Sequence, residues 1–242
     1  SMTVLEDEWG EADMAGYPHY MLKEIHEQPE ALRRCISGRL DKANGSARLG
    51  GLKLEPVKLR NSPLVRLIGC GTALNACKIG QLAIEGLARI PAISHISSEF
   101  RYNEHVINPN SIHFAVSQSG ETADTYAALD LCNKNGMKTC AVVNVIESSI
   151  ARDSEFVLPI HCGPEIGVAS TKAFLGQMLV LYILCLKLAQ KRKDISKKDY
   201  LKKIKNLFNL AKLVKHSLET ENKIQSICSS FVDAKGSMFL GR

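Results

Sequence analysis

The 242-residue sequence lacks the short motifs that identify the commonest nucleotide, metal and redox sites. No G-x-x-x-x-G-K-[ST] pattern is present, which argues against a P-loop for a nucleoside triphosphate. None of the seven histidines forms H-x-H or H-E-x-x-H, and His161 beside Cys162 is too isolated to indicate a metal site, so we predict no metal. The eight cysteines include no C-x-x-C pair, which is typical of buried thiols in a reducing compartment.

The sequence also lacks a hydrophobic run long enough to cross a membrane. The longest apolar run, Met178 to Leu186, is far shorter than the ~20 residues of a spanning helix. The first residues show no basic segment followed by an apolar one, as a secretory signal would. We therefore expect a cytoplasmic protein with no membrane partner. The net charge of +6 is moderate and the basic residues are not interleaved with exposed aromatics, so we predict no nucleic-acid partner, and an anionic small molecule suits the charge equally well.

The sequence does contain short apolar runs that alternate with helical patterns. Apolar residues make up 45%, enough to bury a core. Five runs predict strands: Leu64–Cys70, Ala92–Ile96, Ile112–Ser117, Lys138–Asn144 and Phe156–Ile160. Helical patterns between them include Thr72–Arg89 and Thr122–Asn135. This alternation predicts an α/β fold, a three-layer αβα sandwich with a doubly wound five-stranded parallel sheet. Its binding crevice should lie at the carboxyl ends of the strands.

Segments on either side of this region carry different patterns. From Pro18 to Leu40, apolar residues recur among charges, which predicts an amphipathic helix interrupted near Pro29. Val168–Leu188 predicts a mostly buried helix, and the lysine-rich stretch 191–203 after it is typical of a solvated helix face. The final residues resemble the strand and glycine turn at 67–70, which suggests a fragment cut where an internal repeat begins. We expect an N-terminal extension 1–48, a core domain 49–190, a helical segment 191–236 and a stub 237–242.

The most informative segment is the turn 117–122, Ser-Gln-Ser-Gly-Glu-Thr, which follows a predicted strand and leads straight into a predicted helix. It concentrates three hydroxyls, one carboxamide and the unpaired N–H groups of a helix start around one point. No lysine lies inside it, so neutral donors would carry the binding, and Gly120 lets the backbone approach closely. This arrangement suits the phosphate ester of a small metabolite. The alternative is that Ser117 or Ser119 only caps the helix, with Glu121 in its first turn.

A second candidate is the connection Gly69-Cys70-Gly71-Thr72. It follows the first predicted strand, where doubly wound proteins place ligand-binding glycines, and Thr72 can donate to a sugar hydroxyl. Leu74 stands where a dinucleotide fingerprint needs its third glycine, which argues against a dinucleotide enzyme. Cys70 has no neighbour in sequence that would activate its thiol, so we predict no nucleophile there.

A third candidate is Glu165–Lys172, which leads from the last strand to the apolar helix. Its small residues would let the backbone line a pocket. Ser170 can cap the helix or donate to a ligand, and Lys172 can neutralise Glu165 or a phosphate; the sequence does not rank these roles. Glu121 and Glu165 form either an acid/base pair or two helix N-terminal charges.

Several longer strings resemble one family. They are His19–Ile25, Gly69–Thr72, Ser98–Tyr102, Ser117–Thr125, Glu165–Phe174 and Phe239–Arg242. By these strings, spread over nearly the whole chain, the sequence resembles the glutamine–fructose-6-phosphate aminotransferases (glucosamine-6-phosphate synthases), in the first of their two sugar isomerase (SIS) domains. The serine-rich turn alone would indicate only the wider SIS group. The resemblance implies the flavodoxin-like SIS fold.

The resemblance also implies a function and a set of site residues. The family isomerises and aminates fructose-6-phosphate with ammonia released from glutamine. Fructose-6-phosphate or glucosamine-6-phosphate would be bound here by Thr72, Ser117, Gln118, Ser119, Thr122, Val168 and Ser170. Ala73 departs from the pattern, since relatives often have a serine there. No cofactor is implied, and a homodimer is expected because SIS domains commonly pair.

The family's catalytic groups are not expected in this sequence. Its nucleophilic cysteine belongs to a glutaminase domain, and its isomerase acid/base groups lie in a second SIS domain or the C-terminal tail, so 237–242 would be a stub of that second domain. We expect the chain to bind the sugar phosphate without turning it over, and we predict no catalytic residue in it. The alternative is a non-catalytic sugar-phosphate-sensing module of a regulator. A helix-turn-helix segment would favour it, and the sequence shows none.

Overall fold

The computed structural model describes residues 13–41, 45–51, 61–106, 108, 110–238 and 240. Its centre is a five-stranded sheet of β3 (Val65–Gly69), β4 (Ala92–Ile96), β5 (Ile112–Ser117), β6 (Lys138–Val143) and β7 (Phe156–Pro159). The strand order is β4-β3-β5-β6-β7, and all neighbouring strands are parallel. In chain order this is 2-1-3-4-5, the flavodoxin-like doubly wound order. The predicted sheet is therefore confirmed, with each strand end within one residue of its prediction.

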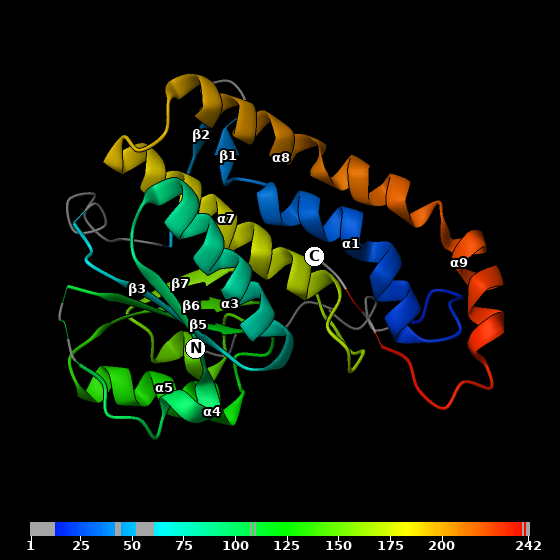
Figure 1. Cartoon of the computed structure of the whole chain (residues 1–242), viewed down its shortest axis with the longest axis horizontal. Helices are drawn as coiled ribbons and strands as arrows, with labels where there is room; N and C mark the ends of the chain where they lie inside the picture. Colours follow the sequence, from blue (N-terminus) through cyan, green and yellow to red (C-terminus); the bar gives the residue numbers. More distant parts are fainter. Residues whose placement is uncertain are drawn as a thin grey trace, which may run out of the picture.

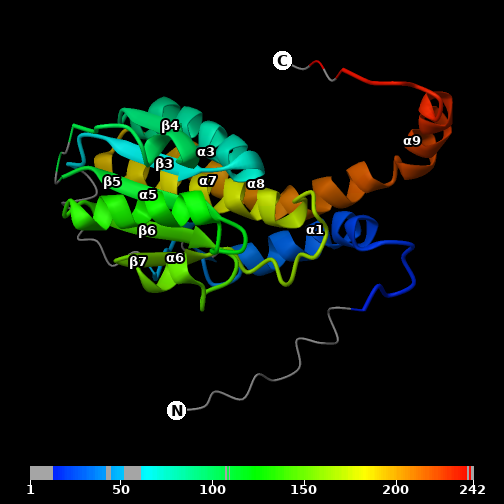
Figure 2. The same cartoon turned by 90° about the horizontal axis from the view of Figure 1, so that it is seen from below.

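Helices cover both faces of this sheet (Figure 1). On one face lie α3 (Gly71–Ala83), which continues as the π-helical turn η2 (Ile84–Ala88), and α7 (Lys172–Arg192). On the other lie α4 (Ser97–Phe100), α5 (Ala123–Lys134) and α6 (Ser149–Arg152) (Figure 2). The three-layer sandwich is confirmed. Outside α7, an additional layer is formed by α1 (Tyr20–Ile36) and α8 (Lys197–Leu218), which pack against α7 and against each other.

The remaining elements lie at the margins of the sandwich. β1 (Leu40–Asp41) and β2 (Ser46–Ala47) pair antiparallel in a small hairpin that the sequence did not predict. α9 (Glu221–Cys228) and the 3₁₀ turn η3 (Ser229–Phe231) follow α8 and bury none of their residues.

The burial of the strands explains why their positions could be predicted from the sequence. β3 and β5 are buried along their whole length, as strands covered on both faces must be. α7 is the one helix among the described residues that is long and apolar enough to cross a membrane, yet 67% of its most apolar window is buried inside the protein. It packs between α3 and α1 as a core helix, so the prediction of a mostly buried helix is confirmed.

The predicted interruption near Pro29 is wrong. Pro29 lies inside a continuous α1, buried against the rest of the protein. Proline has no N–H to donate to the carbonyl four residues before it, which is that of Ile25. The side chain of Gln28 supplies the missing donor, since its Nε2 lies 2.8 Å from the Ile25 oxygen. A side-chain hydrogen bond thus replaces the lost backbone bond and the helix continues.

The C-terminal predictions have mixed outcomes. α8 buries Tyr200, Ile204, Leu207 and Ala211 and exposes most of its lysines, so the solvated face is confirmed. In the stub, residues 239, 241 and 242 lie outside the described residues, as do residues 1–12 of the N-terminal extension. Ser237, Met238 and Leu240 form no strand, because no described strand lies beside them to pair with. The domain boundaries remain predictions.

Candidate functional site

A cavity of about 180 Å³ lies at the carboxyl ends of β3 and β5. The helices that follow these neighbouring strands, α3 and α5, cross to opposite faces of the sheet, so the cavity occupies the topological switch point. All seven residues singled out in the sequence line it: Thr72, Ser117, Gln118, Ser119, Thr122, Val168 and Ser170. The structure therefore brings together three connections that are separated by up to 98 positions in the chain.

The hydroxyls of the serine-rich turn are partly engaged within the turn itself. Ser117 Oγ accepts the Gly120 N–H at 3.0 Å and lies 3.0 Å from Thr122 Oγ1. That pair holds two hydroxyl hydrogens and its mutual bond uses one, so one remains for a ligand. Ser119 Oγ accepts the Glu121 N–H at 3.1 Å, and its own hydrogen has no acceptor among the described residues. The turn thus retains at least two hydroxyl hydrogens that can be donated.

The turn is held in place by the segment that follows β6. Gly120 has a φ of +68°, and a Cβ built there would collide with Ser148. The Gly120 carbonyl accepts the Ile150 N–H at 3.0 Å, and the Gln118 carbonyl accepts the Asn144 N–H at 3.1 Å. The close packing of these two segments explains why a glycine stands in the middle of the turn.

Two helix N-termini open onto this region without a side-chain cap. α3 begins after Cys70 and α5 after Thr122, and neither N-cap side chain accepts a helix N–H group. The first-turn N–H groups and the helix dipoles therefore favour an anion at this end of the sheet.

The N-terminus of α7 differs, because a carboxylate already occupies it. Glu165 Oε1 accepts the N–H groups of Thr171 at 2.9 Å and Ala173 at 3.1 Å, and Oε2 accepts the Ser170 hydroxyl at 2.8 Å. Glu165 thus acts as a helix N-terminal charge. The hydroxyl hydrogen of Ser170 is used internally, so Ser170 faces a ligand only as an acceptor.

Glu121 also binds a helix N-terminus, but not that of its own helix. Its Oε1 accepts the Ser149 N–H at 2.7 Å, at the start of α6. This hydrogen bond holds the pKa of Glu121 below its usual range, so the carboxylate stays ionised. Of the two roles that the sequence left open for Glu121 and Glu165, the geometry favours that of helix N-terminal charges.

Helix α1 holds the pocket wall formed by the β7–α7 connection, a role the sequence did not predict. Glu24 is 2% exposed. Its Oε1 accepts the N–H groups of Ile166 at 2.5 Å and Gly167 at 3.0 Å. One turn further, Glu27 pairs with Lys172 Nζ at 2.5 Å. Lys172 therefore neutralises Glu27, and not Glu165 or a phosphate as the sequence suggested.

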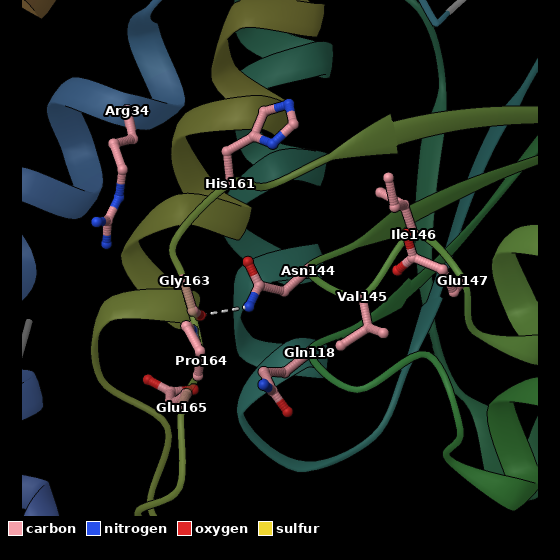
Figure 3. Close-up of a pocket in the computed structure, with 10 residues that line it drawn as sticks. All are labelled: Arg34, Gln118, Asn144, Val145, Ile146, Glu147, His161, Gly163, Pro164 and Glu165. Atoms are coloured by element: carbon pink, nitrogen blue, oxygen red, sulfur yellow. Dashed lines mark hydrogen bonds between the residues drawn. The ribbon is translucent and has the colours of Figure 1, made fainter. Parts of the chain in front are cut away.

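A larger cavity of about 610 Å³ adjoins the smaller one, with Gln118 and Glu165 lining both. Figure 3 shows its side chains converging from α1, from the segment after β6 and from the segment after β7. Asn144 ties the last two together, because its Nδ2 donates to the Gly163 carbonyl at 2.7 Å and its Oδ1 accepts the Cys162 N–H at 2.8 Å. Burial lowers the pKa of His161 in this wall. No motif in the sequence predicted this cavity.

With both cavities defined, the chain can be compared with known proteins. A family model described as the SIS domain matches residues 58–187, which include β3 to β7 and most of α7. The chain belongs to the SIS domain family.

Relatives of this SIS domain include two proteins described as glutamine–fructose-6-phosphate aminotransferase (isomerizing). The one from Caulobacter vibrioides is 40% identical over 95% of this chain, and the one from Bacteroides thetaiotaomicron is 40% identical over 96%. The chain spans only 37% and 38% of their lengths. A solved structure, the C-terminal domain of glucosamine-fructose-6-phosphate aminotransferase from Francisella tularensis, superposes with a TM-score of 0.89 at 35% identity, covering 95% of this chain and 64% of that one.

The cysteines of the chain are mostly core residues. Six of the eight are buried, Cys70 is partly buried at the smaller cavity and Cys228 is exposed. Burial raises the pKa of Cys35 to about 11 and that of Cys132 to about 12, so these thiols stay protonated at neutral pH.

One residue of the smaller cavity was missed entirely by the sequence analysis. Gln177, from the second turn of α7, lines it and is 1% exposed. The available signal was a lone carboxamide in the apolar stretch Phe174–Leu186.

Proposed function

We propose that this SIS domain binds a phosphorylated ketohexose or aminohexose, fructose-6-phosphate or glucosamine-6-phosphate, in the smaller cavity. The observation that carries the proposal is the position of that cavity. It combines free hydroxyl hydrogens from the serine-rich turn with two uncapped helix N-termini, at the switch point of a doubly wound sheet. Neutral donors of this kind hold a phosphate dianion without an added cation.

The parent activity we propose is that of a glutamine–fructose-6-phosphate aminotransferase, which makes glucosamine-6-phosphate from fructose-6-phosphate and glutamine. The support is 40% identity to two proteins of that description over at least 95% of this chain. We propose that the chain corresponds to the first SIS domain of the isomerase part and acts together with a glutaminase domain and a second SIS domain in the cytoplasm. Among the described residues that line the smaller cavity, the one carboxylate is Glu165, and it is occupied by helix N–H groups, so we expect ligand binding without turnover.

Isothermal titration of the chain with fructose-6-phosphate, glucosamine-6-phosphate and fructose tests the binding. Both phosphorylated sugars should bind and fructose should not. Ser119→Ala removes a free hydroxyl and should weaken both. Ser154→Ala should not, since Ser154 follows α6, lines neither cavity and donates its hydroxyl to the Ile150 carbonyl. Equal binding of fructose and its phosphate would contradict the proposal. Formation of glucosamine-6-phosphate by the isolated chain would contradict the absence of turnover.

A further inference from the structure

A buried carboxamide at the smaller cavity has an oxygen without a hydrogen-bond partner among the described residues. Gln177 is 1% exposed, and among the described residues its Oε1 accepts no hydrogen bond. A buried acceptor without a donor costs roughly 1–3 kcal/mol, so such groups are rare unless something else supplies the donor. The structure has a few other buried polar atoms without a partner, but none belongs to a residue that lines this cavity.

The position of Gln177 suggests what that donor is. The cavity is lined by the serine-rich turn, by the start of α3 and by the β7–α7 connection, and Gln177 joins this lining from the second turn of α7. Val116 and Ser117, at the end of β5, line the same cavity. Gln177 is therefore a buried part of the cavity lining, whereas Val168, which also lines the cavity, is fully exposed.

We propose that Gln177 is a further ligand-binding residue, whose carboxamide oxygen accepts a hydrogen from a hydroxyl or amino group on the sugar part of the bound sugar phosphate. This inference rests on the proposed function and extends it to the part of the ligand that lacks the phosphate. A phosphate dianion has no hydrogen to give to an acceptor, whereas each sugar hydroxyl has one. The donors of the serine-rich turn and the acceptor of Gln177 are thus complementary to the two ends of one molecule.

Ala73 makes this contact more important. The resemblance leads us to expect a serine hydroxyl at this position, and the methyl group of Ala73 lines the cavity in its place. The Gln177 carboxamide, in the same lining, is a polar group that can orient the sugar.

Gln177→Met tests the proposal, because methionine has nearly the same length and shape and lacks the carboxamide. We expect the affinity for fructose-6-phosphate and glucosamine-6-phosphate to fall about tenfold, which corresponds to one lost hydrogen bond of about 1.4 kcal/mol. The affinity for inorganic phosphate should not change. The thermal midpoint should stay equal or rise, because an unsatisfied buried acceptor has been removed. Gln190→Met, near the other end of α7, is the matched control.

The outcomes separate this inference from the proposed function. If the wild type binds sugar phosphates and Gln177→Met binds them equally well, Gln177 has a structural role only and the inference is wrong. Equal loss of affinity for sugar phosphate and inorganic phosphate would also overturn it, because Gln177 would then act on the phosphate. A wild-type chain that binds no sugar phosphate refutes both. Should Gln177→Met fold poorly, Gln177→Asn keeps the carboxamide, shortens its reach and should give the same selective loss.

Discussion

Replacing Glu24 by alanine tests whether α1 holds the wall of the binding cavity. The Glu24 carboxylate accepts the N–H groups of Ile166 and Gly167, and alanine would leave both without a partner. Hydrogen bonds to a buried carboxylate contribute about 1.5–3 kcal/mol each, and the relief of burying a charge offsets part of this. We expect Glu24→Ala to lower the free energy of unfolding by about 2–4 kcal/mol.

The same change should weaken ligand binding even where the protein is folded. Without Glu24, the β7–α7 connection must be ordered when the ligand binds, and fixing one residue costs about 1–2 kcal/mol. We expect the affinity for fructose-6-phosphate to fall at least tenfold at a temperature where the variant is fully folded. Urea denaturation and isothermal titration measure the two effects.

A matched control for this experiment lies on the same helix. Glu30 is exposed, and among the described residues it pairs only with Arg33, at 2.7 Å, so Glu30→Ala should change the free energy of unfolding by less than about 0.5 kcal/mol. If the free energy of unfolding of Glu24→Ala lies within about 0.5 kcal/mol of the wild-type value, the β7–α7 connection does not depend on α1. Binding of the sugar phosphate with wild-type affinity would refute the same expectation.

Three further results are expected. Gly120→Ala should lower the free energy of unfolding by about 2 kcal/mol or more, and the control Gly38→Ala by about 1 kcal/mol. Both glycines have a positive φ, but of the two only Gly120 has another segment where a Cβ would be placed. Burial and a nearby arginine lower the pKa of His113 to about 4. His113 is protonated below about pH 6.5 in the unfolded chain but only below about pH 4 in the folded chain. The free energy of unfolding therefore falls as the pH is lowered from about 6.5 to about 4. His113→Gln should remove at most about 2 kcal/mol of the loss between pH 7 and pH 5. Sedimentation velocity should show a homodimer, and a monomer at all concentrations would contradict the expected pairing.

The sheet could be predicted because its strands are buried on both faces. A strand such as β5 is apolar at almost every position and is followed at once by turn residues, so its ends are marked in the sequence. Pro29 was misjudged for the opposite reason. Its effect on α1 depends on one side-chain donor from Gln28, and a proline rule applied to the sequence alone contains no information about that bond.

The site could be predicted where its residues are contiguous. The serine-rich turn carries its chemistry in six successive positions. Thr72 and Ser170 stand in two other short polar connections, and the family resemblance added Val168. Gln177 and Glu24 were missed because each is an isolated polar residue on a helix. Their roles depend on what the fold places beside them, which is the smaller cavity for Gln177 and two backbone N–H groups for Glu24. No spacing in the sequence records such a juxtaposition.

The contacts of α1 bear on where the binding unit of this chain begins. The SIS match starts at residue 58, after α1 has ended at Ile36. Yet three residues of α1 bind the segment after β7. Glu24 accepts N–H groups of the β7–α7 connection, and Glu27 forms an ion pair with Lys172, the first residue of α7. The Arg34 guanidinium donates to the Cys162 carbonyl at 2.9 Å. These contacts all fall on the segment that follows β7 and carries Val168 and Ser170 to the cavity. A protein cut to residues 58–187 would retain the sheet and the serine-rich turn. Its β7–α7 connection would lose the α1 groups that hold it in place. We therefore expect that a protein able to bind the ligand must include α1.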